Sequence, residues 1–222
     1  MQAKAVIFDI DGVLIDSYAA HLQSWQAVAR GYGQQMTESD FATTFGQTSR
    51  EIIRTLWGNA ALNAKQIADF DAEKEVAFRE LVATDYPWMP GAKNLLAALH
   101  EADFRLAFGS SGPPENVELA LQQLDRRDWI GATVTGADVM RGKPDPEVFQ
   151  LAAQRLAVAP SNCVVIEDAC AGIMAANTAS MLSVALVSTG HTRDEYTKAD
   201  YVIEQLSQIS PELIETWIDA QG

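Results

Sequence analysis

Near the start of the chain stands the stretch Ala5-Val6-Ile7-Phe8-Asp9-Ile10-Asp11-Gly12. Its apolar half favours a strand, and an unbroken apolar run is typical of a strand buried on both faces. Asp9 then falls at the carboxyl end of that strand, which is where open α/β sheets bind their ligands. Residues two apart on a strand point to the same side, so the carboxylates of Asp9 and Asp11 can approach one site.

Two carboxylates so close together repel each other unless a cation or a shared proton lies between them. A hard divalent ion with oxygen ligands, Mg²⁺ above all, meets that need. The alternative is a solvated strand end followed by an ordinary turn, since Asp-Gly is a common turn signal. The dipeptide Asp11-Gly12 by itself does not decide between the two.

Three later segments also carry polar residues that could reach such a site. Two of them are apolar strand candidates followed by a hydroxyl or by acids, and one is a loop with a lysine. They are Phe108-Gly109-Ser110, Gly142-Lys143-Pro144-Asp145-Pro146 and Val164-Val165-Ile166-Glu167-Asp168. With the first stretch, and in this order, they resemble the four motifs of the haloacid dehalogenase superfamily of phosphotransferases. The resemblance covers essentially the whole chain and is to the branch of β-phosphoglucomutases and phosphoglycolate phosphatases.

Strand and helix patterns alternate over most of the chain, which predicts an α/β fold with a Rossmann-like parallel sheet flanked by helices. The strand candidates are 5–10, 106–109, 132–135, 163–166, 183–187 and 201–202, and helical patterns cover 92–101, 114–124, 147–156 and 172–178. Asp145 is a candidate N-cap for the third of these helices.

Residues 17–86 break the alternation, because they carry helical patterns and no convincing strand. The helical segments are 18–32, 38–45, 49–57 and 63–84. We therefore expect a catalytic core of residues 1–16 and 87–222 with an all-helical cap of residues 17–86. The resemblance implies the same, since such a cap follows the first motif in the family.

These residues are suited to catalyse the hydrolysis of a phosphate monoester. Asp9 can act as a nucleophile that forms an acyl phosphate, and the resemblance makes it the first Asp of the motif. Asp11 would be the general acid for the leaving oxygen and the general base for water. The resemblance adds that the main-chain carbonyl of Asp11 ligates Mg²⁺. Dehalogenases lack this second Asp, so its presence favours phosphoryl transfer.

The hydroxyl of Ser110 can donate to a phosphoryl oxygen, helped by the backbone N–H of Ser111. Ser111 is also an alternative for the same role, and a polar strand end is the structural alternative. The Lys143 ammonium can lie between Asp9 and the transferring phosphate. The structural alternative is a solvated surface lysine, which is the most common environment of this residue type. Asp168 is the better direct Mg²⁺ ligand, with Glu167 a second ligand or a partner that supports it.

Four positions of the expected cap resemble substrate-binding residues of the β-phosphoglucomutase branch: His21, Trp25, Arg50 and Lys74. Gly46, which begins the loop before Arg50, is a further substrate-binding candidate. His21 and Trp25 are four residues apart and share a helix face. The structural alternatives are a core position for Trp25 and solvated helix charges for Arg50 and Lys74.

The chain has 222 residues and a net charge of −14, which argues against nucleic acid and anionic membranes as partners. We expect no signal peptide or membrane span, a cytoplasmic location, two free buried thiols at Cys163 and Cys170, and a monomer.

We therefore expect a Mg²⁺-dependent phosphatase acting on a small phosphorylated metabolite, a sugar phosphate first of all, through an aspartyl phosphate. The first alternative is β-phosphoglucomutase, an isomerase that uses the same Asp9 chemistry. The second is a phosphonatase, which needs a cap lysine such as Lys74 for a Schiff base. The third is a binding protein without catalysis.

Overall fold

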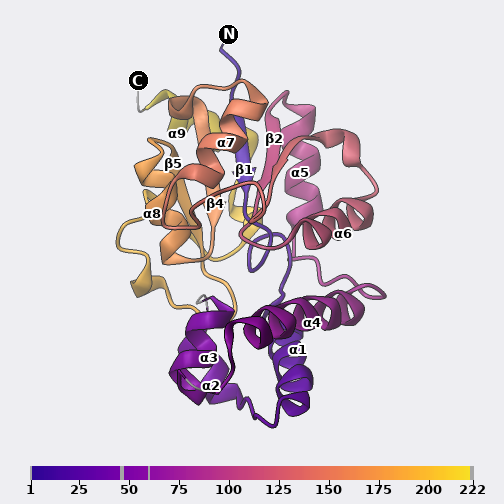
Figure 1. The fold of residues 1–222 in the computed structure, drawn as a ribbon. Helices are drawn as coiled ribbons and strands as arrows, with labels where there is room; N and C mark the ends of the chain where they lie inside the picture. The colour runs from indigo at the N-terminus through magenta and orange to yellow at the C-terminus, as the bar shows by residue number, and fades with distance from the viewer. Residues whose placement is uncertain (1, 46–47, 60, 221–222) are drawn as a thin grey trace. The chain divides into compact units, whose positions relative to one another are not determined.

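The chain divides into two compact units, Met1–Asp16 with Pro87–Gly222 and Ser17–Tyr86. The structure, a computed structural model, describes residues 2–45, 48–59 and 61–220 (Figure 1). We refer to the first unit as the α/β unit and to the second as the helical unit.

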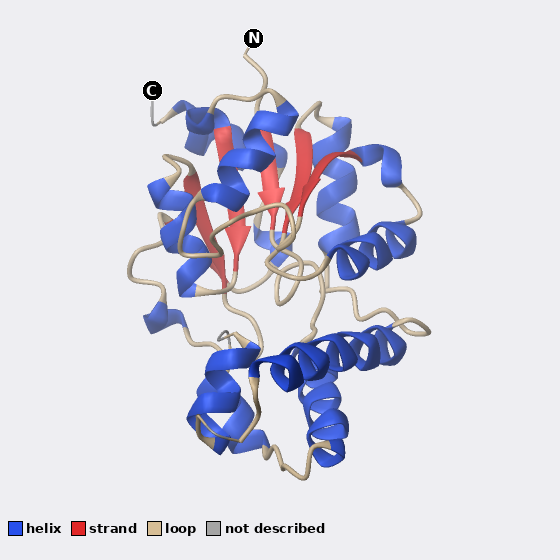
Figure 2. Cartoon of the chain, viewed as in Figure 1, coloured by secondary structure: helices blue, strands red, loops and turns tan. Residues whose placement is uncertain are grey.

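The α/β unit is built on a six-stranded sheet with the order β3-β2-β1-β4-β5-β6, in which all neighbours are parallel. The strands are β1 (Ala5–Phe8), β2 (Arg105–Gly109), β3 (Ile130–Val134), β4 (Cys163–Glu167), β5 (Leu182–Leu186) and β6 (Tyr201–Ile203). All residues of β1, β4 and β5 are buried, as continuous apolar runs predict. The parallel sheet and its flanking helices confirm the predicted fold class (Figure 2).

Helices cover the sheet and bury its apolar side chains. They are α5 (Ala92–Glu101), α6 (Pro114–Leu124), α7 (Glu147–Leu156), α8 (Cys170–Thr178) and α9 (Pro211–Asp219). On one face, Ile7 and Val165 pack in a cluster with Phe149 of α7 and Ala176 of α8. Helix α9, whose N-cap Ser210 accepts from a backbone N–H, has no counterpart among the predicted helices.

The helical unit consists of α1 (Tyr18–Gly31), α2 (Glu38–Thr44), α3 (Ser49–Trp57) and α4 (Ala64–Val82). Capping boxes begin α2, α3 and α4, and each satisfies orphan N–H groups of a first turn. An aromatic cluster that includes Trp25, Phe41 and Phe70 forms its core. No strand is found among the described residues of this unit.

About half of the predicted element boundaries agree with the structure, and the others differ by one or two residues. Strand β1 ends at Phe8 because the carbonyl of Ile10 already accepts turn hydrogen bonds from Leu14 at 2.9 Å and Ile15 at 3.1 Å. The thiol prediction is right for Cys163, which is free and buried, and wrong for Cys170, which is exposed at the start of α8. Among the described residues, no helix is both long and apolar enough to span a bilayer.

Candidate active site

Four of the predicted site residues lie where neighbouring strands end: Asp9 after β1, Ser110 after β2, and Glu167 and Asp168 at the end of β4. Strand β1 pairs in parallel with both β2 and β4. The main-chain N–H of Asp9 continues the ladder by donating to the carbonyl of Ile166 at 3.0 Å. Parallel pairing therefore brings residues more than 150 positions apart in the chain to one edge of the sheet.

Three buried carboxylates form a cluster at this edge. Asp9, Glu167 and Asp168 each offer an oxygen within 4.8 Å of the others, and their exposed fractions are 7%, 1% and 4%. Burial raises the pKa of the Asp9 carboxyl to about 7, against the pull of the Lys143 ammonium. Burial and the charge of Glu167 also raise the pKa of Asp168 well above its ordinary value. Burial, and then the neighbouring carboxylates, therefore disfavour the ionised forms of Asp9 and Asp168.

Lys143 supplies the positive charge in this cluster. Its Nζ lies 2.6 Å from Asp9 Oδ1 and 2.6 Å from Glu167 Oε1, and its side chain is 8% exposed. Burial acts to lower the pKa of this ammonium, but the two carboxylates outweigh burial and raise it. Lys143 is therefore a buried, charged lysine and not a surface one.

The segment before α7 that carries Lys143 is held by side-chain carboxylates. Glu147 accepts from the main-chain N–H groups of Met140 at 3.1 Å and Arg141 at 3.0 Å. Asp145 accepts from the N–H of Glu147 at 3.1 Å, but Pro146 occupies the N-cap position of α7. The N-cap prediction for Asp145 is therefore wrong by one residue, although its carboxylate still satisfies a first-turn N–H.

Ser110 is a buried hydroxyl at the same edge, with 2% of its surface exposed. Its Oγ accepts from the N–H of Gly112 at 3.0 Å, which leaves its proton available for donation to another acceptor. The next residue, Ser111, is exposed. Ser110 is the better placed of the two alternatives because it is fixed and lies directly beyond the strand.

Asp11 lies in a tight turn between β1 and the helical unit. It is half-buried, pairs with Ile15 in an isolated bridge, and its charge acts to raise the pKa of Asp9. Gly12 follows with φ of +75°, a conformation that glycine adopts without strain. A Cβ on Gly12 would lie 1.7 Å from Asp168 Oδ2, so the turn packs directly against the acid cluster.

The donor set of the cluster fits a divalent cation. When all three carboxylates are ionised, they face one ammonium, and two negative charges remain in a buried site. The backbone approaches both β4 acids closely, because a Cβ on Gly172 would lie 1.9 Å from Glu167 Oε1, as one on Gly12 would meet Asp168. Carboxylate oxygens are the ligands that Mg²⁺ prefers, and a charge of +2 would balance the cluster.

The candidate substrate-binding residues of the expected cap lie in the helical unit, and three of them have contacts within it. His21 stacks on Phe78 with ring centroids 4.0 Å apart. Trp25 is 3% exposed and packs within the aromatic core, which is the structural alternative for this residue. Lys74 is buried and ion-paired with Glu75. Substrate contacts of these side chains stay predictions.

The two remaining candidates of the expected cap are Arg50 and Gly46. Arg50 is exposed in the first turn of α3. Gly46 lies outside the described residues. An exposed guanidinium is compatible with the solvated helix charge that the sequence left open for Arg50.

Two residues of the α/β unit that the sequence analysis does not single out contact the acid cluster. Ser188 Oγ donates to Asp168 Oδ2 at 2.7 Å, and the Tyr196 hydroxyl donates to the main-chain carbonyl of Asp168. Both follow β5 in a segment without a recognisable motif. Ser188 lies two residues beyond the buried strand β5, so a search for polar residues after buried strands would have included its position, but not its contact with Asp168.

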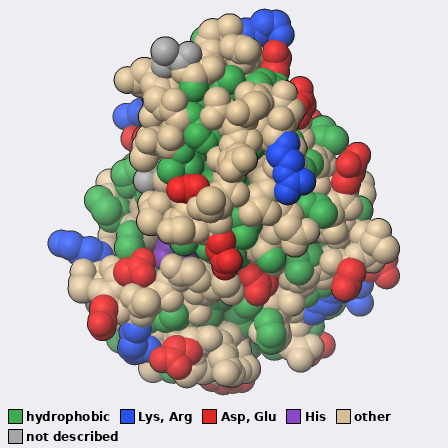
Figure 3. Space-filling view, turned by 90° about the horizontal axis from the view of Figure 1, so that it is seen from below, with side chains coloured by type: hydrophobic (Ala, Val, Ile, Leu, Met, Phe, Trp, Pro, Cys, Tyr) green, Lys and Arg blue, Asp and Glu red, His purple; other side chains and the backbone are tan. Residues whose placement is uncertain are grey.

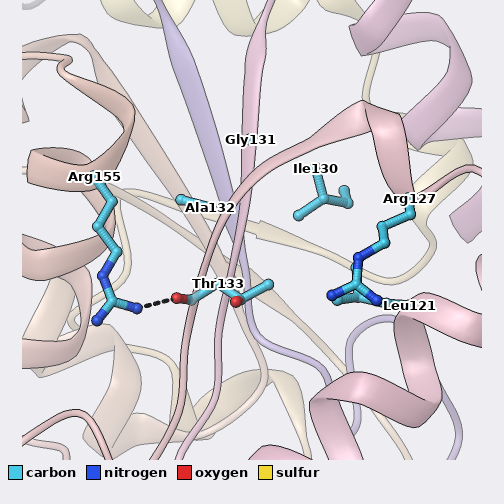
Figure 4. A pocket seen from close by; sticks show the side chains of 7 residues that line it. All are labelled: Leu121, Arg127, Ile130, Gly131, Ala132, Thr133 and Arg155. Carbon is cyan, nitrogen blue, oxygen red and sulfur yellow. Dashed lines mark hydrogen bonds between the residues drawn. The ribbon is translucent and has the colours of Figure 1, made fainter.

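A separate pocket of about 400 Å³ lies at the edge strand β3 and contains none of the candidate residues (Figure 4). Two of its lining residues are arginines. Arg155 donates to the carbonyl of Thr133 and Arg127 pairs with Glu118 at 2.7 Å. Both guanidinium groups therefore already have acceptors in the protein.

Comparisons with known proteins identify the family of the chain. The haloacid dehalogenase-like hydrolase model matches residues 3–180. A phosphorylated carbohydrates phosphatase from Thermotoga maritima is 33% identical over 183 residues, covering 80% of this chain and 82% of the relative. A β-phosphoglucomutase from Bacillus subtilis is 31% identical over 224 residues, covering 96% and 95%. The crystal structure of a β-phosphoglucomutase from Clostridium difficile superposes with a TM-score of 0.85 and 25% identity, covering 99% of both chains.

The parallel α/β sheet is of the Rossmann-like class and carries a buried acid cluster at its carboxyl edge. The chain belongs to the haloacid dehalogenase-like hydrolase family. The family match confirms the resemblance seen in the four sequence motifs.

Proposed function

We propose that this chain is a Mg²⁺-dependent phosphatase that hydrolyses a phosphorylated sugar, or a similarly small metabolite, through an aspartyl phosphate on Asp9. The observation that carries the proposal is the position of Asp9: it directly follows the central strand β1, lies in a buried acid cluster, and has Lys143 Nζ at 2.6 Å from its Oδ1. A carboxylate in this position can attack phosphorus while the neighbouring ammonium attracts the phosphoryl group.

The proposed reaction proceeds in two steps. Asp9 attacks phosphorus as the bond to the leaving oxygen breaks, and Asp11 gives that oxygen a proton. Water then attacks the aspartyl phosphate, Asp11 takes a proton from it, and phosphate leaves. Asp11 suits this role because it is half-buried on the turn beside Asp9 and keeps contact with solvent.

Lys143 and Ser110 would position the phosphoryl group between the two steps. The Lys143 ammonium neutralises the negative charge of the phosphoryl oxygens near Asp9, and the Ser110 hydroxyl donates to one of them. The backbone N–H of Ser111, close to the start of α6, adds a further donor. These groups are fixed before the substrate arrives, so little reorganisation is needed during the reaction.

The residues that would hold Mg²⁺ are Asp9, Asp168 and the main-chain carbonyl of Asp11. Glu167 suits a supporting part, because its Oε1 faces Lys143 at 2.6 Å and its Oε2 accepts from Ala169 at 2.6 Å. When bound, the cation would offset the charge of the carboxylates and polarise a phosphoryl oxygen. Removal of the cation is therefore expected to abolish turnover.

The substrate class follows from charge and from relatives. With a net charge of −14, and with Lys and Arg scattered singly among acids on the face shown in Figure 3, the protein suits a small anion more than a nucleic acid. The Thermotoga relative is named for phosphorylated carbohydrates. We propose that residues 17–86 serve as the cap that selects among such substrates, with His21 and Arg50 as the first residues to test. A cytoplasmic monomer is part of the same proposal.

β-Phosphoglucomutase is the second candidate, favoured by the B. subtilis relative and the C. difficile structure. It would use the same Asp9 chemistry but return the phosphoryl group to a bisphosphorylated sugar. A phosphonatase is less well supported, since the Lys74 amine is paired with Glu75. A phosphonatase would form a Schiff base between Lys74 and phosphonoacetaldehyde that borohydride reduces to a stable adduct. The absence of this adduct would exclude the phosphonatase.

The test is phosphate release from a panel of phosphorylated metabolites with Mg²⁺, for the wild type and Asp9→Asn. We expect a preferred sugar phosphate whose turnover falls by about 10³-fold or more in the variant. Asp16→Asn, a change at an exposed residue one position before the helical unit, is the matched control and should keep its activity. Negligible phosphate release together with conversion of β-glucose 1-phosphate to glucose 6-phosphate would establish the mutase instead.

A further inference from the structure

The segment after β5 holds the Asp168 side chain by one short hydrogen bond. Ser188 Oγ donates to Asp168 Oδ2 at 2.7 Å, and the two residues are 9% and 4% exposed. A buried hydroxyl that donates to a carboxylate restricts the rotation of that carboxylate and stabilises its charge. Ser188 is thus bonded to the acid that the proposed cation site depends on most.

A second contact fixes the backbone of the same residue. The hydroxyl of Tyr196 donates to the main-chain carbonyl of Asp168, and its ring packs with Ile173 and Ala185 in a small apolar cluster. Tyr196 is 3% exposed, so its ring cannot leave this position without opening the cluster. Two side chains from one segment therefore hold Asp168 at its main chain and at its carboxylate.

The two oxygens of Asp168 consequently differ. Oδ2 receives the Ser188 hydroxyl and lies against the backbone of Gly12, where a Cβ would come within 1.7 Å of it. A Cβ at the same place would be 3.1 Å from Oδ1, the more distant oxygen. Oδ1 has neither of these contacts, which leaves it the better candidate of the two oxygens for a cation ligand.

We propose that Ser188 is a positioning residue for the cation site: it anchors Asp168 Oδ2 and so presents Oδ1 to a divalent metal. The inference rests on the proposed function, since it needs a metal at the acid cluster. Hydrogen-bond partners of metal-ligating carboxylates act in this way, and their loss weakens metal binding by about 10- to 100-fold.

The chain contains a matched control. Ser183, on β5, is fully buried and donates to the Asp200 carboxylate at 2.9 Å. Ser183→Ala removes the same hydroxyl and the same type of bond as Ser188→Ala, but away from the acid cluster. A general loss of stability should appear in both variants, whereas a loss of metal affinity should appear in Ser188→Ala alone.

The experiment is a titration of the full chain with Mn²⁺, followed by the electron paramagnetic resonance signal of the free ion, with Mg²⁺ as competitor. It needs no substrate and no turnover. We expect saturable binding by the wild type, its loss in Asp168→Asn, and affinity lower by about 10- to 100-fold in Ser188→Ala. Ser188→Thr, which keeps the hydroxyl, and Ser183→Ala should stay within about threefold of the wild type. If Ser188→Ala does not fold, Ser188→Cys, a weak donor of similar size, takes its place.

Equal affinity of the wild type and Ser188→Ala, or equal losses in Ser188→Ala and Ser183→Ala, would overturn the role of Ser188 and leave the proposed phosphatase standing. A wild type that shows no saturable binding would instead contradict the Mg²⁺ dependence of the proposed function, and with it this inference. The two failures are therefore distinguishable in one titration series.

Discussion

The Nζ atom of Lys143 lies 2.6 Å from Oδ1 of Asp9, although 134 residues separate the two in the chain. Lys143 also contacts Glu167 at 2.6 Å, so one ammonium joins the ends of β1 and β4. Because the site is buried, these two ion pairs stabilise the fold and also fix the position of Asp9, the candidate nucleophile. Stability and activity should therefore change together when the ammonium is removed.

Lys143→Met should abolish activity and destabilise the fold. The phosphoryl group loses its neutralising charge, so we expect turnover to fall by about 10²-fold or more. The carboxylates of Asp9 and Glu167 lose their buried partner, a loss that typically costs about 3–5 kcal/mol. Phosphate release and urea unfolding without metal measure the two effects.

Lys65→Met is the matched control. Lys65 pairs with Asp69 at 2.5 Å, but its side chain is 83% exposed, so its pair should contribute about 0–1 kcal/mol at most. Equal stability changes in the Lys65 and Lys143 variants would contradict the buried pair.

Gly12→Ala should damage the cation site more than the backbone conformation alone explains. Gly12 and Gly33 have φ of +75° and +68°, but a Cβ on Gly33 meets nothing within 4 Å. Gly33→Ala should therefore cost only the strain of a left-handed residue, about 1 kcal/mol. Gly12→Ala adds a clash with Asp168 and should also lose Mn²⁺ binding. Retained Mn²⁺ affinity in Gly12→Ala would show that the turn does not pack against Asp168 as described.

Asp138 should contribute to stability in a defined pH window. Arg155, with Nη2 at 2.6 Å from Asp138 Oδ1, and then Thr135 lower the pKa of this carboxyl from 3.8 to about 2. A lowered pKa means that the contribution is present above pH 3.8 and is lost as the pH falls toward 2. Because Arg155 is partly exposed, we expect about 1 kcal/mol.

The measurement for Asp138 is the difference in free energy of unfolding between the wild type and Asp138→Asn. The wild type should be the more stable protein at pH 6, and the difference should shrink steadily from pH 4 to pH 2. A difference that grows as the pH falls would have the wrong sign for a carboxylate stabilised in its charged form.

The two cysteines should differ in reactivity. Cys170 is exposed, whereas Cys163 is buried in β4, and burial raises its pKa to about 12. A disulfide reagent such as Ellman's should therefore modify one thiol in the native protein and two in guanidinium. Cys170→Ser should remove the native reaction completely, and rapid modification of two native thiols would contradict the burial of Cys163.

The sequence predicts much of this fold because strand burial and motif order agree. Parallel strands bring their carboxyl ends to one edge, so the rule that places Asp9 after an apolar run also places Ser110 and Asp168. The sheet class follows from the alternation of strand and helix patterns, and the family from the resemblance of the four motifs in their order. Strand and helix ends could not be fixed as well, because they depend on turn hydrogen bonds such as those accepted by Ile10.

Side-chain environments are harder to predict than backbone positions. The sequence predicts Lys143 beside Asp9, but only the folded sheet shows that Glu167 contacts the same ammonium. Cys170 follows a buried strand closely but lies on the outer side of a helix start. Ser188 has no motif, and its meeting with Asp168 depends on how the segment after β5 folds back.

The central claim is that Asp9 becomes phosphorylated, and the most direct test is acid-quench labelling with radiolabelled acetyl phosphate. Its acetate leaving group needs no proton, so Asp11→Asn should still form the aspartyl phosphate but hydrolyse it slowly. We predict label approaching one phosphoryl group per chain in Asp11→Asn, released by hydroxylamine and carried by the peptide that contains Asp9, with none in Asp9→Asn. Label that persists in Asp9→Asn, or that lies on another residue, would contradict the account.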